Sequence, residues 1–233
     1  MTVSKLKAKS PSELDKVKRL KVLISGPSGS GKSTIVGSFP RTYIIDSEQG
    51  MSFYKPLLEA SGSQVFQTTD PQAVVDEVRT LLAEEHDFLT IALDPCTNIW
   101  HEEIEQAEAR VGEAYGKHYG AAGKATRRLV RLLLRLDMNI IFTAHQKEVY
   151  SAGGATIDTT FDGWKKSDYF FDLWLKTRSE LAGDKVTFWA KVAKTRLDGF
   201  PTLSEFALGE STKQGEKRIF AYQAICERFG GEK

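Results

Sequence analysis

The chain has 233 residues, 41% of them hydrophobic, and a formal net charge of +1. A net charge this close to zero gives the protein no overall electrostatic attraction to nucleic acid. Any contact with nucleic acid must therefore come from local basic patches. The only two cysteines, Cys96 and Cys226, lack CxxC spacing, which argues against a zinc site and a disulfide scaffold. No apolar run has the length of a membrane-spanning helix and no signal-peptide core is present, so we expect a cytoplasmic protein without a membrane partner.

The beginning of the chain is locally basic and predicts an arm, residues 1–18, ahead of a globular core at 19–233. Only Glu13 and Asp15 oppose the cations of this basic run, which continues just past the arm and comprises Lys5, Lys7, Lys9, Lys16, Lys18, Arg19 and Lys21. A solvated charged arm is the ordinary interpretation of such a run.

The core alternates apolar runs with helical patterns. Asp70 and Pro71 predict a helix N-cap followed by a first-turn proline. The other predicted helices are 32–38, 101–110 and 124–137, and the predicted strands are 20–25, 42–46, 64–67, 88–93, 139–144, about 169–175 and about 186–193. This order predicts an α/β fold with a mostly parallel central sheet flanked by helices and an antiparallel C-terminal extension.

A glycine-rich loop joins the first predicted strand to the first predicted helix. It fits GxxxxGK[ST], the P-loop pattern, whose backbone N–H groups surround phosphate oxygens at the start of a helix. We expect Lys32 to reach the β- and γ-phosphates of ATP and Ser33 to bind Mg²⁺. The predicted nucleotide-binding residues are Gly26, Pro27, Ser28, Gly29, Ser30, Gly31, Lys32, Ser33 and Thr34.

A second magnesium ligand is predicted at Asp94, which ends the apolar run FLTIALD. A carboxylate at this strand end can hold a Mg²⁺-bound water beside the P-loop. ABC-type ATPases carry a glutamate directly after this aspartate, whereas this chain has Pro95, and their LSGGQ motif is missing as well. That family is therefore disfavoured.

Beyond the P-loop, the order of motifs resembles the RecA core. The matching segments are TYIIDSEQG at 42–50, NIIFTAH at 139–145 and KVAKTR at 191–196. The resemblance implies that Glu48 is the catalytic base and that His145 stands where these proteins carry a polar γ-phosphate sensor, often glutamine. It also implies that Lys194 and Arg196 contact the γ-phosphate of a neighbouring subunit. A short core of this kind looks like the phage Sak-type single-strand annealing proteins.

Two predicted loops, at about 112–123 and 147–163, occupy the places of the DNA-binding loops of RecA-like proteins. Basic and aromatic side chains on mobile backbone suit phosphate contact and base stacking. The candidate DNA-binding residues are Tyr115, Lys117, His118, Tyr119, Lys147 and Tyr150. In the helix between the loops, Arg127, Arg131 and Arg135 form a stripe that an amphipathic surface helix explains, with DNA contact as the alternative.

The resemblance predicts an ATP- and magnesium-dependent protein that binds single-stranded DNA, with DNA-stimulated ATP hydrolysis and a role in annealing or strand exchange. Its expected partners are single-stranded DNA, further copies of itself in a filament or ring, and a single-strand DNA-binding protein, in the host cytoplasm if the chain is phage-encoded. Two alternatives stay open. One is a P-loop nucleotide or nucleoside kinase, although residues 151–163 lack the arginines of a kinase lid. The other is a non-catalytic nucleotide-dependent switch.

Overall fold

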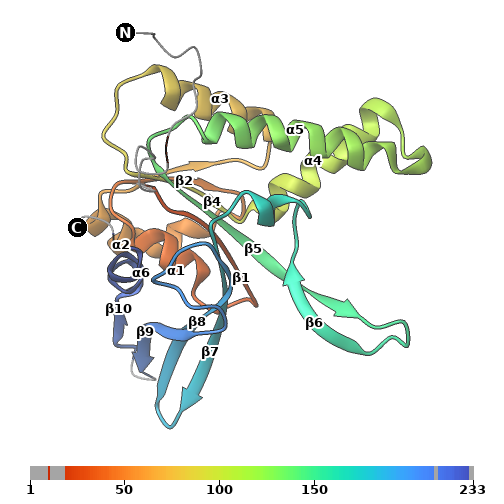
Figure 1. Ribbon diagram of the computed structural model, residues 1–233. Helices are drawn as coiled ribbons and strands as arrows, with labels where there is room; N and C mark the ends of the chain where they lie inside the picture. The colour runs from red at the N-terminus through yellow and green to blue at the C-terminus, as the bar shows by residue number, and fades with distance from the viewer. Residues whose placement is uncertain (1–9, 11–18, 213–214, 231–233) are drawn as a thin grey trace.

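The computed structural model describes residue 10 and residues 19–212 and 215–230, so the predicted arm lies almost wholly outside the described residues. One sheet runs through the described core in the order β10-β9-β8-β7-β1-β5-β4-β2-β3, with β6 paired to β5 (Figure 1). The strands are β1 (Lys21–Gly26), β2 (Thr42–Asp46), β3 (Gln64–Gln67), β4 (Thr90–Asp94), β5 (Asn139–Tyr150), β6 (Thr156–Phe161), β7 (Leu173–Ala182), β8 (Lys185–Thr195), β9 (Glu205–Thr212) and β10 (Lys217–Ile219).

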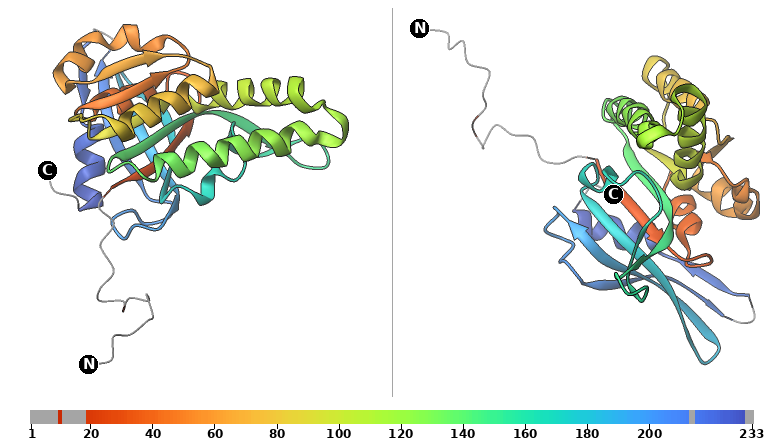
Figure 2. Two further views of the ribbon diagram at one scale, coloured as in Figure 1. Left: turned by 90° about the horizontal axis from the view of Figure 1, so that it is seen from above. Right: turned by 90° about the vertical axis from the view of Figure 1, so that its right-hand side faces the viewer.

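Helices cover both faces of this sheet. They are α1 (Lys32–Ser38), α2 (Lys55–Ser61), α3 (Pro71–Ala83), α4 (Cys96–Val111), α5 (Lys117–Leu133) and α6 (Ala221–Phe229), with short 3₁₀ segments η2 (Gly50–Tyr54), η3 (Ala114–Gly116) and η4 (Ser167–Tyr169). Figures 1 and 2 show α1, α2 and α6 on one face and the long α3, α4 and α5 on the other. Among the described residues, no helix is both long enough and apolar enough to cross a bilayer.

Strand β1 shows why the sheet is buried on both sides. Val22 and Ile24 pack with α1 and α6 in one apolar core, while Leu23 between them packs into a second core with α3 and α5. Successive side chains of a strand point to opposite faces, so a continuous apolar run is what a sheet between two helical layers requires. Strands β2, β3, β4, β5 and β7 join β1 in a parallel arrangement, and β8, β9 and β10 continue it antiparallel. The predicted fold class is confirmed.

Several predicted elements have the bounds that the sequence indicates, namely the helix at 32–38 and the strands at 42–46 and 64–67. Asp70 caps α3, because its carboxylate accepts from the backbone N–H groups of Gln72 and Ala73. The predicted strands at 169–175 and 186–193 are longer and shifted, as β7 and β8.

The first predicted loop, 112–123, is wrong over most of its length, because α5 already begins at Lys117. Glycine lowers helix propensity, but here tertiary packing makes use of it. A Cβ on Gly123 would lie 3.3 Å from the indole Nε1 of Trp164, so the missing side chain lets that ring pack against α5. The predicted helix at 124–137 is the later part of α5, and it ends at Leu133.

The second predicted loop, 147–163, is largely a β-hairpin. Strand β5 runs on to Tyr150, and Lys147 to Tyr150 pair antiparallel with residues 156–160 of β6. The β-branched residues Thr156, Ile157, Thr159 and Thr160 favour a strand. The turn at 151–155, with Gly154 at a φ of 82°, and residues 162–163 after β6 keep loop character.

Candidate functional site

The carboxyl ends of four neighbouring strands bring the predicted site residues together. In the register of the sheet, Gly26 at the end of β1 lies opposite His145 in β5, and Asp46 at the end of β2 lies opposite Asp94 at the end of β4. The P-loop follows Gly26 directly and leads into α1. In open α/β sheets, ligands bind at this edge.

The P-loop backbone is shaped by two glycines and held by a neighbouring strand. Gly31 has a φ of 90°, a left-handed conformation that favours glycine. A Cβ on Gly26 would collide with the side chain of Thr177 in β7, so β7 packs directly against the loop. The hydroxyl of Thr177 also lies 2.7 Å from that of Ser30, which fixes the middle of the loop.

Lys32 lies inside this loop. Its ammonium donates to the carbonyl oxygens of Gly26 and Pro27, both at 2.9 Å. Burial lowers the pKa of Lys32, and the nearby carboxylates of Asp94 and Glu48 oppose that shift. The site therefore holds a desolvated cation that phosphate oxygens would stabilise strongly.

Asp94 is the buried carboxylate of the site, with 5% of its surface exposed. Burial raises the pKa of its carboxyl, and hydrogen bonds from Thr143 and Ser33 oppose that shift. Thr143, in β5, donates to one carboxylate oxygen, a contact that sequence reasoning missed. The structure thus brings Ser33 and Asp94 together, as predicted.

These residues suit a magnesium ion that arrives with a nucleotide. In the described part of the chain, no group of three His, Cys, Asp or Glu side chains could hold a metal by itself. Mg²⁺ in nucleotide sites keeps several waters and takes one or two protein ligands beside the phosphates. The Ser33 hydroxyl and the Asp94 carboxylate meet that requirement.

Glu48 stands on a tight turn after β2. The buried carboxylate of Asp46 accepts from the backbone N–H groups of Glu48, Gly50 and Met51 at 2.9–3.2 Å and so fixes the turn. The Glu48 side chain reaches His145, whose Nε2 lies 2.7 Å from its Oε1. The predicted base and the predicted sensor are therefore direct partners.

The middle of β5 connects this pair to the β5–β6 hairpin. The backbone N–H of His145 donates to the hydroxyl of Thr97 at 2.9 Å, and that hydroxyl donates to the carbonyl of Asp162 at 2.7 Å. Asp162 in turn donates from its N–H to the carbonyl of His145 at 2.8 Å. Thr97 lies in the first turn of α4, so α4 fixes both strands of the hairpin at its base.

Lys194 and Arg196 lie elsewhere. Lys194 lies near the end of β8 opposite Trp174, and Arg196 directly follows that strand. Trp174 in turn lies beside Leu23 in β1, about 10 Å along that strand from Gly26 of the P-loop. Lys194 donates to the carbonyls of Asp168 and Phe171, and Arg196 lies 3.5 Å from the carboxylate of Asp172. The pair cannot reach its own P-loop, so a phosphate contact would have to be made to another subunit.

The candidate DNA-binding residues form two groups that project on the same side of the molecule (Figure 1). We call the first group, Tyr115, Lys117 and Tyr119 at the α4–α5 connection, the helical tip; all three side chains are exposed. The prediction of His118 as a DNA contact is wrong, because its side chain, in the first turn of α5, is buried. On the hairpin, Tyr150 is exposed, while Lys147 is half-buried and bound to Asp162 at 2.8 Å.

A small cavity of about 60 Å³ opens beside Gly31 and Thr34, where α1 begins. Phe188 of β8 packs against Gly31, and strands β9 and β10 form the remaining walls. This cavity adjoins the predicted nucleotide-binding residue Thr34, but its volume is too small to enclose a nucleoside.

A parallel sheet with a P-loop after β1, a buried aspartate at the end of β4 and a glutamate after β2 defines a P-loop NTPase domain with a RecA-like fold. A model of the AAA domain family matches residues 18–182, more than half of the chain, so the chain belongs to that family of AAA domain proteins. Among curated proteins, no match was found.

Solved structures share the fold at low sequence identity. A KaiC-like protein from the hyperthermophilic archaeon Pyrococcus horikoshii OT3 superposes with a TM-score of 0.54 at 12% identity, over 86% of this chain and 88% of that one. The RadB recombinase gives a TM-score of 0.52 at 15% identity, over 84% of this chain and 89% of that one. At such identities the likeness establishes the fold alone.

Proposed function

We propose that this chain is an ATPase that binds single-stranded DNA and promotes annealing or strand exchange, as the phage Sak-type annealing proteins do. The observation that carries the proposal is the contact between His145 and Glu48. Glu48 is the candidate base for ATP hydrolysis, and His145 is the last residue before the hairpin with its candidate DNA contacts. A displacement of the hairpin by DNA therefore acts on the base through a single hydrogen-bonded pair.

The residues of the site divide the chemistry among them. The P-loop N–H groups and Lys32 bind the phosphates and balance the charge that develops on the transferred phosphoryl group. Ser33 and Asp94 hold Mg²⁺, which supplies further charge neutralisation when bound. Glu48 accepts a proton from the attacking water, and His145 sets the position of the Glu48 carboxylate.

Oligomer formation completes the proposal. Lys194 and Arg196 lie at the sheet end opposite the P-loop, so stacked copies would bring them to the γ-phosphate of a neighbour. A cation supplied in this way increases phosphoryl-transfer rates by about 10³–10⁵ in related enzymes. This arrangement supports the proposal of a filament or ring on DNA, and the fold shared with the RadB recombinase agrees with a recombination role. A single-strand DNA-binding protein is the proposed second partner.

The test is phosphate release with and without an oligothymidylate, in the wild type and in the hairpin variant Lys147→Ala/Tyr150→Ala. Both changed residues lie beyond His145, so we expect the variant to keep the basal rate and lose stimulation by DNA. The matched control is Lys55→Ala/Arg218→Ala, which alters two exposed cations on α2 and β10.

A wild-type rate that DNA leaves unchanged would overturn the proposal. ATP consumption that requires a nucleoside or nucleotide acceptor would identify the kinase alternative. Slow hydrolysis that DNA does not accelerate, together with nucleotide-dependent binding of a protein partner, would identify the nucleotide-dependent switch.

A further inference from the structure

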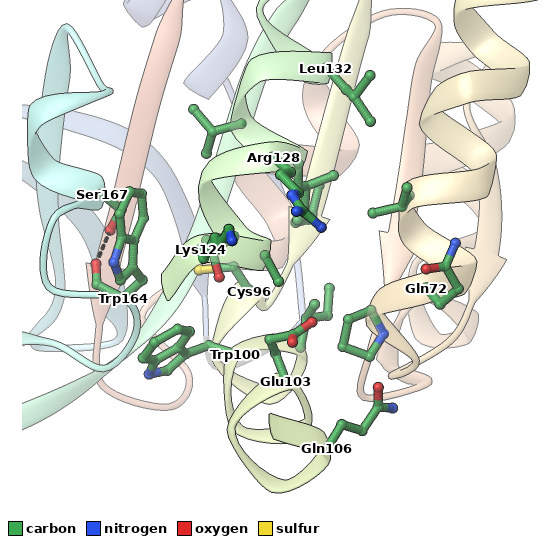
Figure 3. A pocket seen from close by; sticks show the side chains of 18 of the residues that line it. Gln72, Cys96, Trp100, Glu103, Gln106, Lys124, Arg128, Leu132, Trp164 and Ser167 are labelled. Atoms are coloured by element: carbon green, nitrogen blue, oxygen red, sulfur yellow. Dashed lines mark hydrogen bonds between the residues drawn. The ribbon is translucent and has the colours of Figure 1, made fainter. Parts of the chain in front are cut away.

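A groove between α3, α4 and α5 lies outside the P-loop and is lined by residues of all three helices. Its volume is about 680 Å³, within the range of ligand pockets. Figure 3 shows Trp100 and Trp164 at one end, Gln72 of α3 at the other and Arg128 of α5 between them. Its lining thus combines flat aromatic rings with polar and cationic groups.

The charges that line the groove are predominantly positive. Four cations stand there, Arg79, Arg110, Lys124 and Arg128, against the single carboxylate of Glu103. Arg110 is bound to Glu103 at 2.7 Å and Arg79 to Asp76 at 2.9 Å, whereas Lys124 and Arg128 form no ion pair with any described residue.

Helix α5 extends this positive surface beyond the groove. It carries five Lys and Arg and no Asp or Glu, in a chain whose total charge is nearly balanced. Lys124, Arg128 and Arg131 stand four and three residues apart, so they lie on one face of the helix and are all exposed. At the usual rise per residue the three span about 10 Å. That length accommodates about three phosphates of a stacked strand.

We propose that this groove is a binding site for single-stranded DNA, in which one base stacks on the indoles of Trp100 and Trp164 while the phosphates follow Lys124, Arg128 and Arg131. The inference rests on the proposed function and adds a site distinct from the helical tip and the hairpin. A base between aromatic rings with phosphates on cations is the usual recognition of single strands. The basic N-terminal arm carries the same sign of charge as α5 and does not complement it.

The groove also adjoins the magnesium ligand. Leu93 and Cys96, on its floor, flank Asp94 and Pro95 at the junction of β4 and α4. DNA in the groove would therefore contact the first turns of α4, the helix whose Thr97 holds the base of the hairpin.

The test measures binding of a labelled oligothymidylate against salt concentration. Lys124→Gln/Arg128→Gln removes two exposed cations, and we expect the slope of log K against log salt to become shallower by about 1.4, at about 0.7 per phosphate. The control Lys55→Ala/Arg218→Ala is expected to keep the wild-type slope. An unchanged slope and affinity in the groove variant would overturn the inference.

The second arm compares thymidine with abasic oligonucleotides. In the wild type, we expect removal of the bases to weaken binding about tenfold or more, since stacking on aromatic side chains is worth about that much per base. Trp100→Leu/Trp164→Leu is expected to reduce this preference for bases, and an unchanged preference would overturn the stacking assignment. Trp100→Phe/Trp164→Phe keeps aromatic rings and is expected to restore the preference for thymidine, which controls for misfolding.

Other results separate the two proposals. Normal binding by the groove variants, with binding lost in Lys117→Ala/Lys147→Ala, would overturn the groove and leave the proposed function standing. Free thymidine monophosphate binding as tightly as the oligonucleotide would make the occupant a mononucleotide and overturn the assignment to DNA. A wild type that binds no oligonucleotide would overturn both.

Discussion

Replacing Glu48 or His145 is expected to change the rate of ATP hydrolysis much more than the free energy of unfolding. The two side chains are about half exposed, at 48% and 42% of their surface. Exposed pairs of this kind contribute about 0.2–1 kcal/mol to the free energy of unfolding. Glu48→Gln and His145→Ala are therefore expected to fold normally, with at most about 1 kcal/mol lost.

The expected effect on rate is much larger. Glu48→Gln removes the proton acceptor, and a positioned base contributes about 10²–10⁴ in rate. At about 1.4 kcal/mol per tenfold change, this is about 3–5 kcal/mol of activation free energy. His145→Ala keeps the carboxylate but releases it from its hydrogen bond, so we expect an intermediate rate between the wild type and Glu48→Gln.

The assay is single-turnover hydrolysis with protein in excess over ATP, combined with denaturant unfolding of each variant. Glu59→Gln serves as the control, because Glu59 is an exposed carboxylate on α2 outside the site. Wild-type hydrolysis by Glu48→Gln would refute the assignment of the base. If the hydrolysis rate of either variant falls only in proportion to its fraction of folded protein, the link between the pair and catalysis is refuted.

Three further predictions concern the metal ligand, the DNA contacts and the subunit contact. Burial raises the pKa of Asp94, so its negative charge lowers the free energy of unfolding at pH values above that raised pKa. This destabilisation is absent below about 3.9, the pKa of an aspartate in the unfolded chain. Asp94→Asn is therefore expected to unfold at higher denaturant than the nucleotide-free wild type at neutral pH, with no difference in strong acid; a constant difference at all pH values would contradict this. Lys117→Ala/Lys147→Ala is expected to weaken binding of single-stranded DNA and leave nucleotide affinity unchanged without DNA; normal DNA binding would place the contacts elsewhere. Two variants, Lys194→Ala/Arg196→Ala and Lys32→Ala, are each expected to be inactive alone and to regain ATPase activity when they are mixed. If mixed oligomers form and no activity returns, Lys194 and Arg196 do not act on a neighbouring subunit.

The sequence predicts the phosphate site well because its signals are local. The P-loop occupies consecutive positions, and the apolar runs on either side have the length of a strand and a helix. Asp94 is found in the same way, as the polar end of a buried run. Parallel strands then bring such ends to one edge of the sheet without further information.

The contacts that complete the site are long-range and were not predictable. Nothing in the sequence pairs Glu48 with His145, or Thr143 with Asp94, since these contacts depend on the strand order. The extent of α5 depends on Trp164 packing against Gly123. The burial of His118 was missed because a segment expected as a loop is the first turn of that helix.

The closing elements were missed as well. Strands β9 and β10 and helix α6 lie at one end of the sheet, and residues 201–229 show no motif that marks them. Their apolar residues are nevertheless buried against α1, with Leu208 and Ile225 in the same core as Ile35. A weak signal was present in residues 205–212, where the large apolar side chains of Phe206 and Leu208 stand two apart and are both buried.

The most direct measurement of the central claim is magnesium-dependent phosphate release by the wild type and by Lys32→Ala, each with and without single-stranded DNA. Lys32 lies inside the P-loop beside Asp94 and Glu48, so its loss removes the cation that balances the developing phosphoryl charge. We expect the wild type to hydrolyse ATP and to do so faster with DNA, and Lys32→Ala to be inactive under both conditions. Hydrolysis by Lys32→Ala at the wild-type rate would contradict the claim that this P-loop is the catalytic site.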